Sequence, residues 1–169
     1  MEVEKHRRAQ IIDALYELFE QLKEPSEFPL HVKTVQKRYV HWTQLDQQGA
    51  IPALLLSYDE VLGEREGGAG AKFAALGETE EYLPIALDAV LKESSVTPKP
   101  ITDQISDTIY TIKRLIKGTP DLDVEGVYQT KIPEVHTSAG RISALEGTPF
   151  EVVRFNLVVT HIYPSNTSV

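Results

Sequence analysis

The glycine-rich stretch at residues 63–76, "GEREGGAGAKFAAL", is the first place where this sequence could bind a ligand. A phosphate-binding P-loop needs a serine or threonine directly after its lysine, because that hydroxyl binds magnesium, but Phe73 follows Lys72 here. The glycines also miss the Gly-x-Gly-x-x-Gly spacing of a dinucleotide site, and Glu64 and Glu66 would place negative charge beside a phosphate. We therefore predict a flexible hairpin tip that becomes ordered when a partner holds it.

The acidic stretch "DLDVEG" at residues 121–126 imitates the first half of an EF-hand calcium loop. The twelfth position of such a loop must be a bidentate glutamate, and here that position is Ile132. The pattern favours an acid-rich turn over a calcium site.

The remaining reactive side chains form no recognisable catalytic pattern. The five histidines contain no pair at i and i+4, which a helical zinc site requires, although His136 and His161 lie on predicted strands and could meet in space. Ser57 and Ser106 lack the context of a nucleophile elbow, and the chain contains no cysteine. We predict no enzyme activity, no cofactor and no metal.

Composition indicates one globular domain spanning residues 1–169. The chain is 41% hydrophobic and 25% charged, and no apolar run approaches the roughly 20 residues that span a bilayer. The charged N-terminus has no apolar signal core, which argues against secretion, and the lack of cysteine fits a reducing compartment. A net charge of −8 would not attract duplex DNA through the overall field.

Two stretches, residues 4–24 and 100–118, are predicted to be amphipathic helices. Apolar side chains recur in both at three- and four-residue spacing. They are Ile11, Leu15, Leu18 and Leu22 in the first stretch, and Ile105, Ile109, Ile112 and Ile116 in the second. Pro25 ends the first pattern, while Pro100 and Gly118 suit the start and end of the second.

Five stretches are predicted to be strands: residues 30–42, 53–62, 80–94, 127–137 and 150–163. The last alternates most clearly, with Val153, Phe155, Leu157 and Val159 on one face. In the first, Val32, Thr34, Gln36, Arg38 and Val40 would share a face. Residues 43–52 read as a turn or short helical connection.

The predicted strands are joined largely by hairpins. Residues 53–62 and 81–92 would flank the glycine-rich tip as arms of one hairpin, and residues 138–149 would form a second tip. Pro84 predicts an edge strand or a bulge. The order predicts an α+β fold: a mostly antiparallel sheet with two amphipathic helices packed on one face and long hairpin loops. Residues 164–169 are predicted to be a flexible tail.

This arrangement of elements resembles the tail terminator (tail completion) proteins of long-tailed bacteriophages. The resemblance rests on five stretches: "IIDALYELFEQL", "IPALLLSYDE", "EEYLPIALDAVL", "ITDQISDTIYTIKRLIKG" and "FEVVRFNLVVTHIYP". It implies a sheet flanked by helices that assembles as a hexameric ring. Such a ring caps the tail tube, stops its polymerisation and joins it to head-completion proteins, with genomic DNA in transit through the lumen and no membrane involved.

The resemblance also implies a place in the virion, at the neck region of a tail assembled in the host cytoplasm. It carries no catalytic residues. A ring closes by contacts between two different surfaces, which long hairpin tips suit. The interface candidates are chosen for composition and expected exposure: Trp42, Arg65, Glu66, Lys72 and Arg141. Trp42, the only tryptophan, could equally anchor a core.

Two alternatives remain open at the level of sequence. The protein could have another structural role in the same assembly, as a head-completion or tail tube protein. It could also be an unrelated small enzyme or ligand-binding module with an antiparallel α+β sheet.

Overall fold

The computed structural model of the chain describes residues 6–58, 71–75, 78–93, 99–137 and 147–164. Its centre is a sheet in which the strand order is β1-β2-β4-β6-β5, with β3 paired to β4. The strands are β1 (Thr34–Gln36), β2 (Ala53–Tyr58), β3 (Ala71–Ala75), β4 (Glu78–Lys92), β5 (Val127–Thr137) and β6 (Phe150–Pro164). Every pairing is antiparallel except that of β1 with β2.

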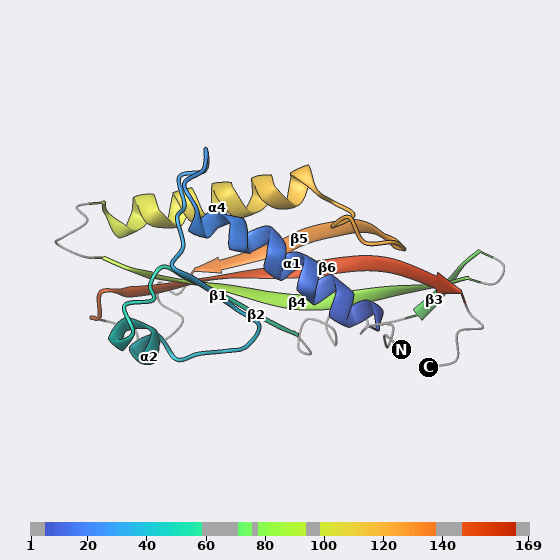
Figure 1. Cartoon of the computed structure of the whole chain (residues 1–169), viewed down its shortest axis with the longest axis horizontal. Helices are drawn as coiled ribbons and strands as arrows, with labels where there is room; N and C mark the ends of the chain where they lie inside the picture. Colours follow the sequence, from blue (N-terminus) through green and yellow to red (C-terminus); the bar gives the residue numbers. More distant parts are fainter. Residues whose placement is uncertain (1–5, 59–70, 76–77, 94–98, 138–146, 165–169) are drawn as a thin grey trace.

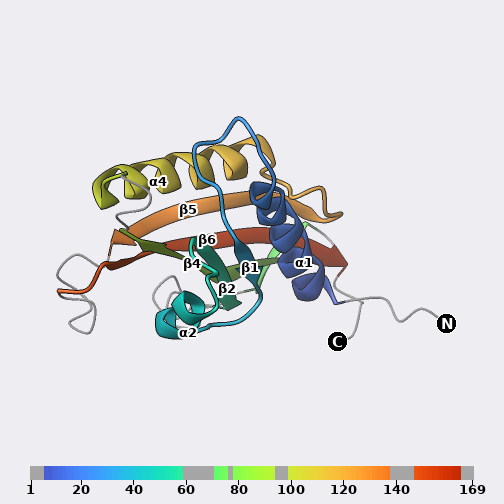
Figure 2. The same cartoon turned by 60° about the vertical axis from the view of Figure 1, so that its left-hand side comes forward.

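Two helices cover one face of this sheet. They are α1 (Arg7–Glu20), which continues into the short 3-10 helix η1 (Gln21–Lys23), and α4 (Ile101–Gly118). Figures 1 and 2 both place α4 above the sheet, with α1 beside it across the strands. One continuous apolar core joins the helices to the strands. Its central members are Ile11, Leu15, Phe19, Leu83, Ile85, Leu87, Ile112, Ile116, Val153, Phe155, Leu157 and Val159.

The sequence-based fold class is confirmed: the protein is an α+β fold with a mostly antiparallel sheet. Strand β6 shows why the alternation was informative. The four side chains predicted to share a face, from Val153 to Val159, are all fully buried beneath the helices. Successive side chains of a pleated strand point to opposite faces, so a long strand with one buried face can be recognised from its alternating sequence.

A short helix, α2 (Trp42–Gln47), lies on the opposite face of the sheet, at one end (Figures 1 and 2). It packs over a second, smaller apolar cluster of Val40, Leu45, Ala53, Leu55 and Val90. The parallel strands β1 and β2 are connected through α2, which matches the predicted short helical connection.

The prediction of a strand over residues 30–42 is wrong for most of its length, because β1 contains only Thr34–Gln36. Val32 packs with Val35 in the helix-covered core, whereas Val40 packs under α2 on the other side. The valines therefore do not share one strand face. The segment passes from one side of the sheet to the other, and β-branched content cannot distinguish such a crossing from a strand.

The prediction that Pro84 marks an edge strand or a bulge holds only locally, because β4 as a whole is neither an edge strand nor bulged against β6. Strand β4 is internal, and its register with β6 continues without interruption from Leu83 through Pro84 to Ile85. On the other side of β4, strand β2 pairs only from Ile85 onward and β3 only up to Glu81. Among the described residues, neither strand pairs with Pro84, so its missing N–H interrupts neither of these two ladders.

The glycine-rich stretch requires a further correction. Residues 71–75 form strand β3 on the start of β4 and are not part of a loop tip. The two long segments were correctly predicted as antiparallel partners, because β2 pairs with β4 over residues 53–58 and 85–90. Residues 59–70 and most of the second predicted tip, residues 138–146, lie outside the described residues, as does almost all of the predicted tail.

Candidate interaction surfaces

Trp42, the first interface candidate, begins α2 and is half-buried. Its ring lies 4.7 Å from that of Phe150 and 4.8 Å from that of His41, measured between ring centroids. It also packs against the smaller apolar cluster under α2. Trp42 therefore anchors α2 to the end of β6, and only the remaining part of its ring is available to a neighbour.

The other four interface candidates are not placed by the structure. Arg65, Glu66 and Arg141 lie outside the described residues, and Lys72 lies in β3, of which only the backbone path is described. Of the five candidates, the structure therefore places only the Trp42 side chain.

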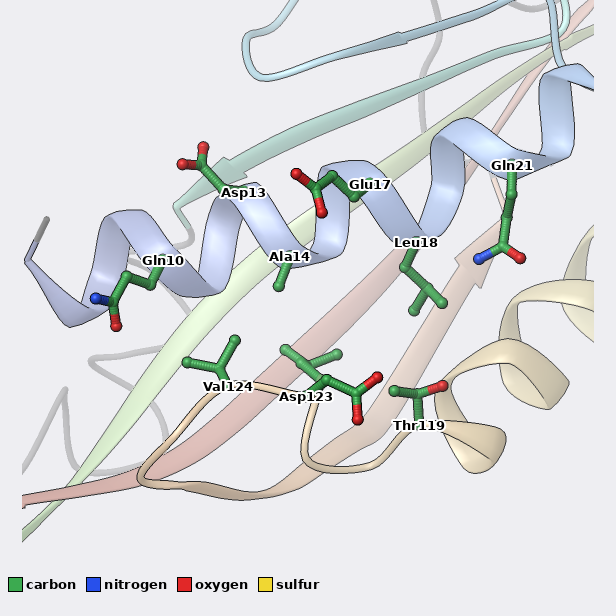
Figure 3. Close-up of a pocket in the computed structure, with 10 residues that line it drawn as sticks. Gln10, Asp13, Ala14, Glu17, Leu18, Gln21, Thr119, Asp123 and Val124 are labelled. Carbon is green, nitrogen blue, oxygen red and sulfur yellow. The ribbon is translucent and has the colours of Figure 1, made fainter.

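A groove of about 550 Å³ runs between α1 and the turn that follows α4. Figure 3 shows Ala14 and Leu18 pointing from α1 toward this turn, from which Val124 points back. Acidic side chains stand along the groove, with Glu17 on α1 and Asp123 on the turn. The groove thus combines a small apolar floor with negative charge on both sides.

The acidic character of this groove is not cancelled within the described part of the chain. Asp13, which also lines the groove, forms an ion pair with Lys37, but no ion pair links Glu17 or Asp123 to another described residue. Both side chains are exposed.

The turn beside the groove is the predicted acid-rich turn at residues 121–126. Asp121 accepts a hydrogen bond from the backbone N–H of Asp123 at 3.1 Å, which is the behaviour expected of an Asx turn. Among the described residues, no group of three or more histidine, aspartate or glutamate side chains is placed to hold a metal ion.

The second half of α4 carries an exposed basic surface, which we call the basic face: Tyr110, Lys113, Arg114 and Lys117. These residues follow i, i+3, i+4 and i+7 spacing and so lie along one side of the helix. Arg114 donates a hydrogen bond to the Tyr110 hydroxyl at 2.6 Å. No acidic residue occurs from Tyr110 to Gly118. This surface was not predicted from the sequence, although the spacing of its residues and the absence of acidic residues can be read there.

A polar network lies on the sheet face opposite α1 and α4. Arg154 donates two hydrogen bonds to Asp88, at 2.7 and 2.8 Å, and the Asp88 side chain is only 6% exposed. Glu134 accepts a hydrogen bond from Asn156 at 3.1 Å and lies 3.0 Å from the His136 ring nitrogen. The network joins β4, β5 and β6, and the charges of Asp88 and Arg154 balance each other within it.

His161 lies on the other face of β6 from His136, so the structure does not bring the two histidines together. It is completely buried, 3.7 Å from Glu81. Glu81 is held in turn by Arg8 of α1, at 2.7 and 2.9 Å. Burial lowers the pKa of His161; Glu81 opposes that shift, while Arg7, Arg8 and His6 reinforce it.

This geometry predicts a loss of stability on mild acidification. The histidine of the unfolded chain takes up a proton near pH 6.5, but folded His161 does so only at lower pH. Below about pH 6.5 the unfolded state therefore binds more protons than the folded state. The contribution of neutral His161 to the free energy of unfolding is complete above that pH and is lost as the pH falls toward the pKa of folded His161. Urea unfolding at about pH 7.5 and pH 5.5 should show a smaller pH effect in His161→Gln than in the wild type. His31→Gln, which replaces an exposed histidine, should behave as the wild type; equal pH dependence in all three would contradict the prediction.

Comparison with known proteins gives no family assignment. No protein-family model matches the chain, and no curated protein matches it. Among the helices that the structure describes, none has the length and hydropathy of a membrane-spanning segment.

Proposed function

We propose that this protein is a tail terminator: it forms a ring that caps a completed bacteriophage tail tube, ends tube polymerisation and presents the surface that joins the tail to the head. The virion neck is its place of action, and genomic DNA passes through the lumen of the ring. It acts by docking, without bond chemistry.

The observation that carries this proposal is the spatial arrangement of the five stretches on which the resemblance to tail terminators rests. The three strand stretches that the resemblance uses become β2, β4 and β6, which are adjacent in the sheet. The two helix stretches become α1 and α4, which pack on the same face of those strands. Stretches spread over most of the chain thus form one compact unit.

A second observation supports a ring over a symmetric pair. A ring closes when one surface of a subunit meets a different surface of its neighbour. The protein offers two such unlike surfaces, the acidic groove along α1 and the basic face of α4. The Asp88–Arg154 pair is a poorer candidate for attracting a neighbour, because its two charges already match each other.

Electron microscopy of particles assembled without this protein tests the proposal. Without a terminator, tube growth should continue, so we expect tails of irregular, excessive length that lack heads. Normal-length tails without heads would instead indicate a head-completion protein, and the absence of tails would indicate a tube protein. Supplying the wild-type chain in trans should restore uniform length.

A further inference from the structure

We propose that the second half of α4 of one copy docks in the groove between α1 and the 119–124 turn of the next copy. This inference rests on the proposed ring and names the two surfaces that meet in it. The groove is the acceptor surface, and the basic face of α4 is the donor surface.

The dimensions of the two surfaces agree. The groove follows α1 from Gln10 to Gln21, which is about 17 Å of helix at 1.5 Å per residue. The basic face extends from Tyr110 to Lys117, which is about 11 Å. One surface can therefore lie lengthwise against the other.

The charges also agree on both sides of the groove. At about 100° per residue, Lys113 and Lys117 lie on one side of Tyr110, and Arg114 lies on the other. A helix laid along the groove would have the α1 acid Glu17 on one side and Asp123 on the other. Its basic side chains would thus meet an acid on each side, whichever way it runs.

The floor of the groove suits Tyr110, which begins the basic face and points between the directions of its lysines and of Arg114. Tyr110 is 49% exposed, which is a large apolar ring left in solvent. Ala14 and Leu18 offer a small apolar surface for this ring (Figure 3). Tyrosine and arginine are enriched among the residues that dominate interface energetics, so the pair of Tyr110 and Arg114 fits an anchor role.

Disulfide cross-linking tests the contact directly, because the chain contains no cysteine and the background is zero. The variant Ala14→Cys/Tyr110→Cys places one thiol on the apolar floor of the groove and one at the first residue of the basic face, which the proposal brings against that floor. On oxidation, it should give a ladder of covalent oligomers up to the ring size. A mixture of the two single-cysteine variants should stop at dimers. The variant Glu24→Cys/Tyr110→Cys, with one thiol at an exposed site outside the groove lining, should give no ladder.

Charge reversal provides an independent test that keeps Tyr110. Glu17→Lys/Asp123→Lys should weaken self-association by roughly tenfold or more, as should Lys113→Glu/Arg114→Glu, because attraction becomes repulsion. Combining all four changes, or mixing the two variants, should restore association. Glu24→Lys/Glu27→Lys shifts the net charge as much as the groove variant, but at exposed positions outside the groove lining, and should associate as the wild type.

The failure of this contact is distinguishable from the failure of the ring. If the wild type forms a closed oligomer by light scattering but gives no specific ladder and tolerates both reversals, the ring stands and the proposed contact is wrong. If the wild type stays a single copy both in solution and on tail tubes, the ring proposal falls, and this contact with it. A ladder that ends at dimers in the two-cysteine variant would show a two-fold pair and overturn the ring arrangement.

Discussion

Replacing Phe155 by alanine is expected to lower the free energy of unfolding by about 3–5 kcal/mol. Phe155 is fully buried near the middle of β6, and its neighbours in the ladder are Leu87 of β4 and Val135 of β5. It belongs to the core that both helices cover. Truncation removes its transfer free energy and leaves a cavity that helices anchored elsewhere on the sheet can fill only in part.

Urea denaturation measures this effect, with two variants as controls. Phe155→Leu retains most of the buried volume and should lose less stability than Phe155→Ala. Val158→Ala truncates a half-buried side chain on the opposite face of the same strand, and its cost should be much smaller. If Phe155→Ala and Val158→Ala were equally destabilising, the helix-covered face would not be the main core.

Replacing Gly126 by alanine is expected to cost about 2–4 kcal/mol, which is unusual for a single added methyl group. Gly126 has φ +83°, a conformation that side chains disfavour. A Cβ atom there would also lie 2.6 Å from the carbonyl oxygen of Ile162 and 3.1 Å from the guanidinium of Arg7. The backbone of β6 cannot move away freely, because the Ile162 N–H donates to the Gly126 carbonyl at 2.7 Å.

Gly49 provides the matched control for this prediction. It also has a positive φ, +63°, but an added Cβ would have no atom within 4 Å. Gly49→Ala should therefore show only the backbone cost of about 1–2 kcal/mol. Gly118→Ala, at the end of α4, has neither problem and should be within about 0.5 kcal/mol of the wild type. Equal losses for Gly126→Ala and Gly49→Ala would show that the close approach to β6 has no energetic consequence.

The substitution Gly126→Ala should also affect assembly of the proposed ring. The turn that contains Gly126 forms one wall of the groove, and it is held at its other end by α4, which carries the basic face. A shift of this turn would displace both proposed contact surfaces together. We therefore expect Gly126→Ala to weaken self-association even under conditions in which the variant remains folded.

Local patterns in the sequence determined most of the fold. The stripe from Ile105 to Ile116 and the alternation from Val153 to Val159 each report a buried face, because helix and strand geometry repeat within a few residues. The same reasoning failed at residues 30–42, where the chain crosses from one side of the sheet to the other within a few residues. At Pro84 the sequence indicated an edge or a bulge but not that β4 is internal, because the partners of a strand lie far away in the chain.

The α+β class, both long helices and the strands with a clear residue pattern are predictable from the amino-acid sequence, because each follows from side chains that are close together in the chain. The candidate interaction surfaces, in contrast, depend on how distant segments pack against one another. Glu17 and Asp123 face one groove although about a hundred residues separate them, and Arg8 reaches Glu81 beside His161. Such contacts depend on how the helices and strands pack on one another. No periodicity or spacing along the chain indicates which residues of two distant segments will lie close together.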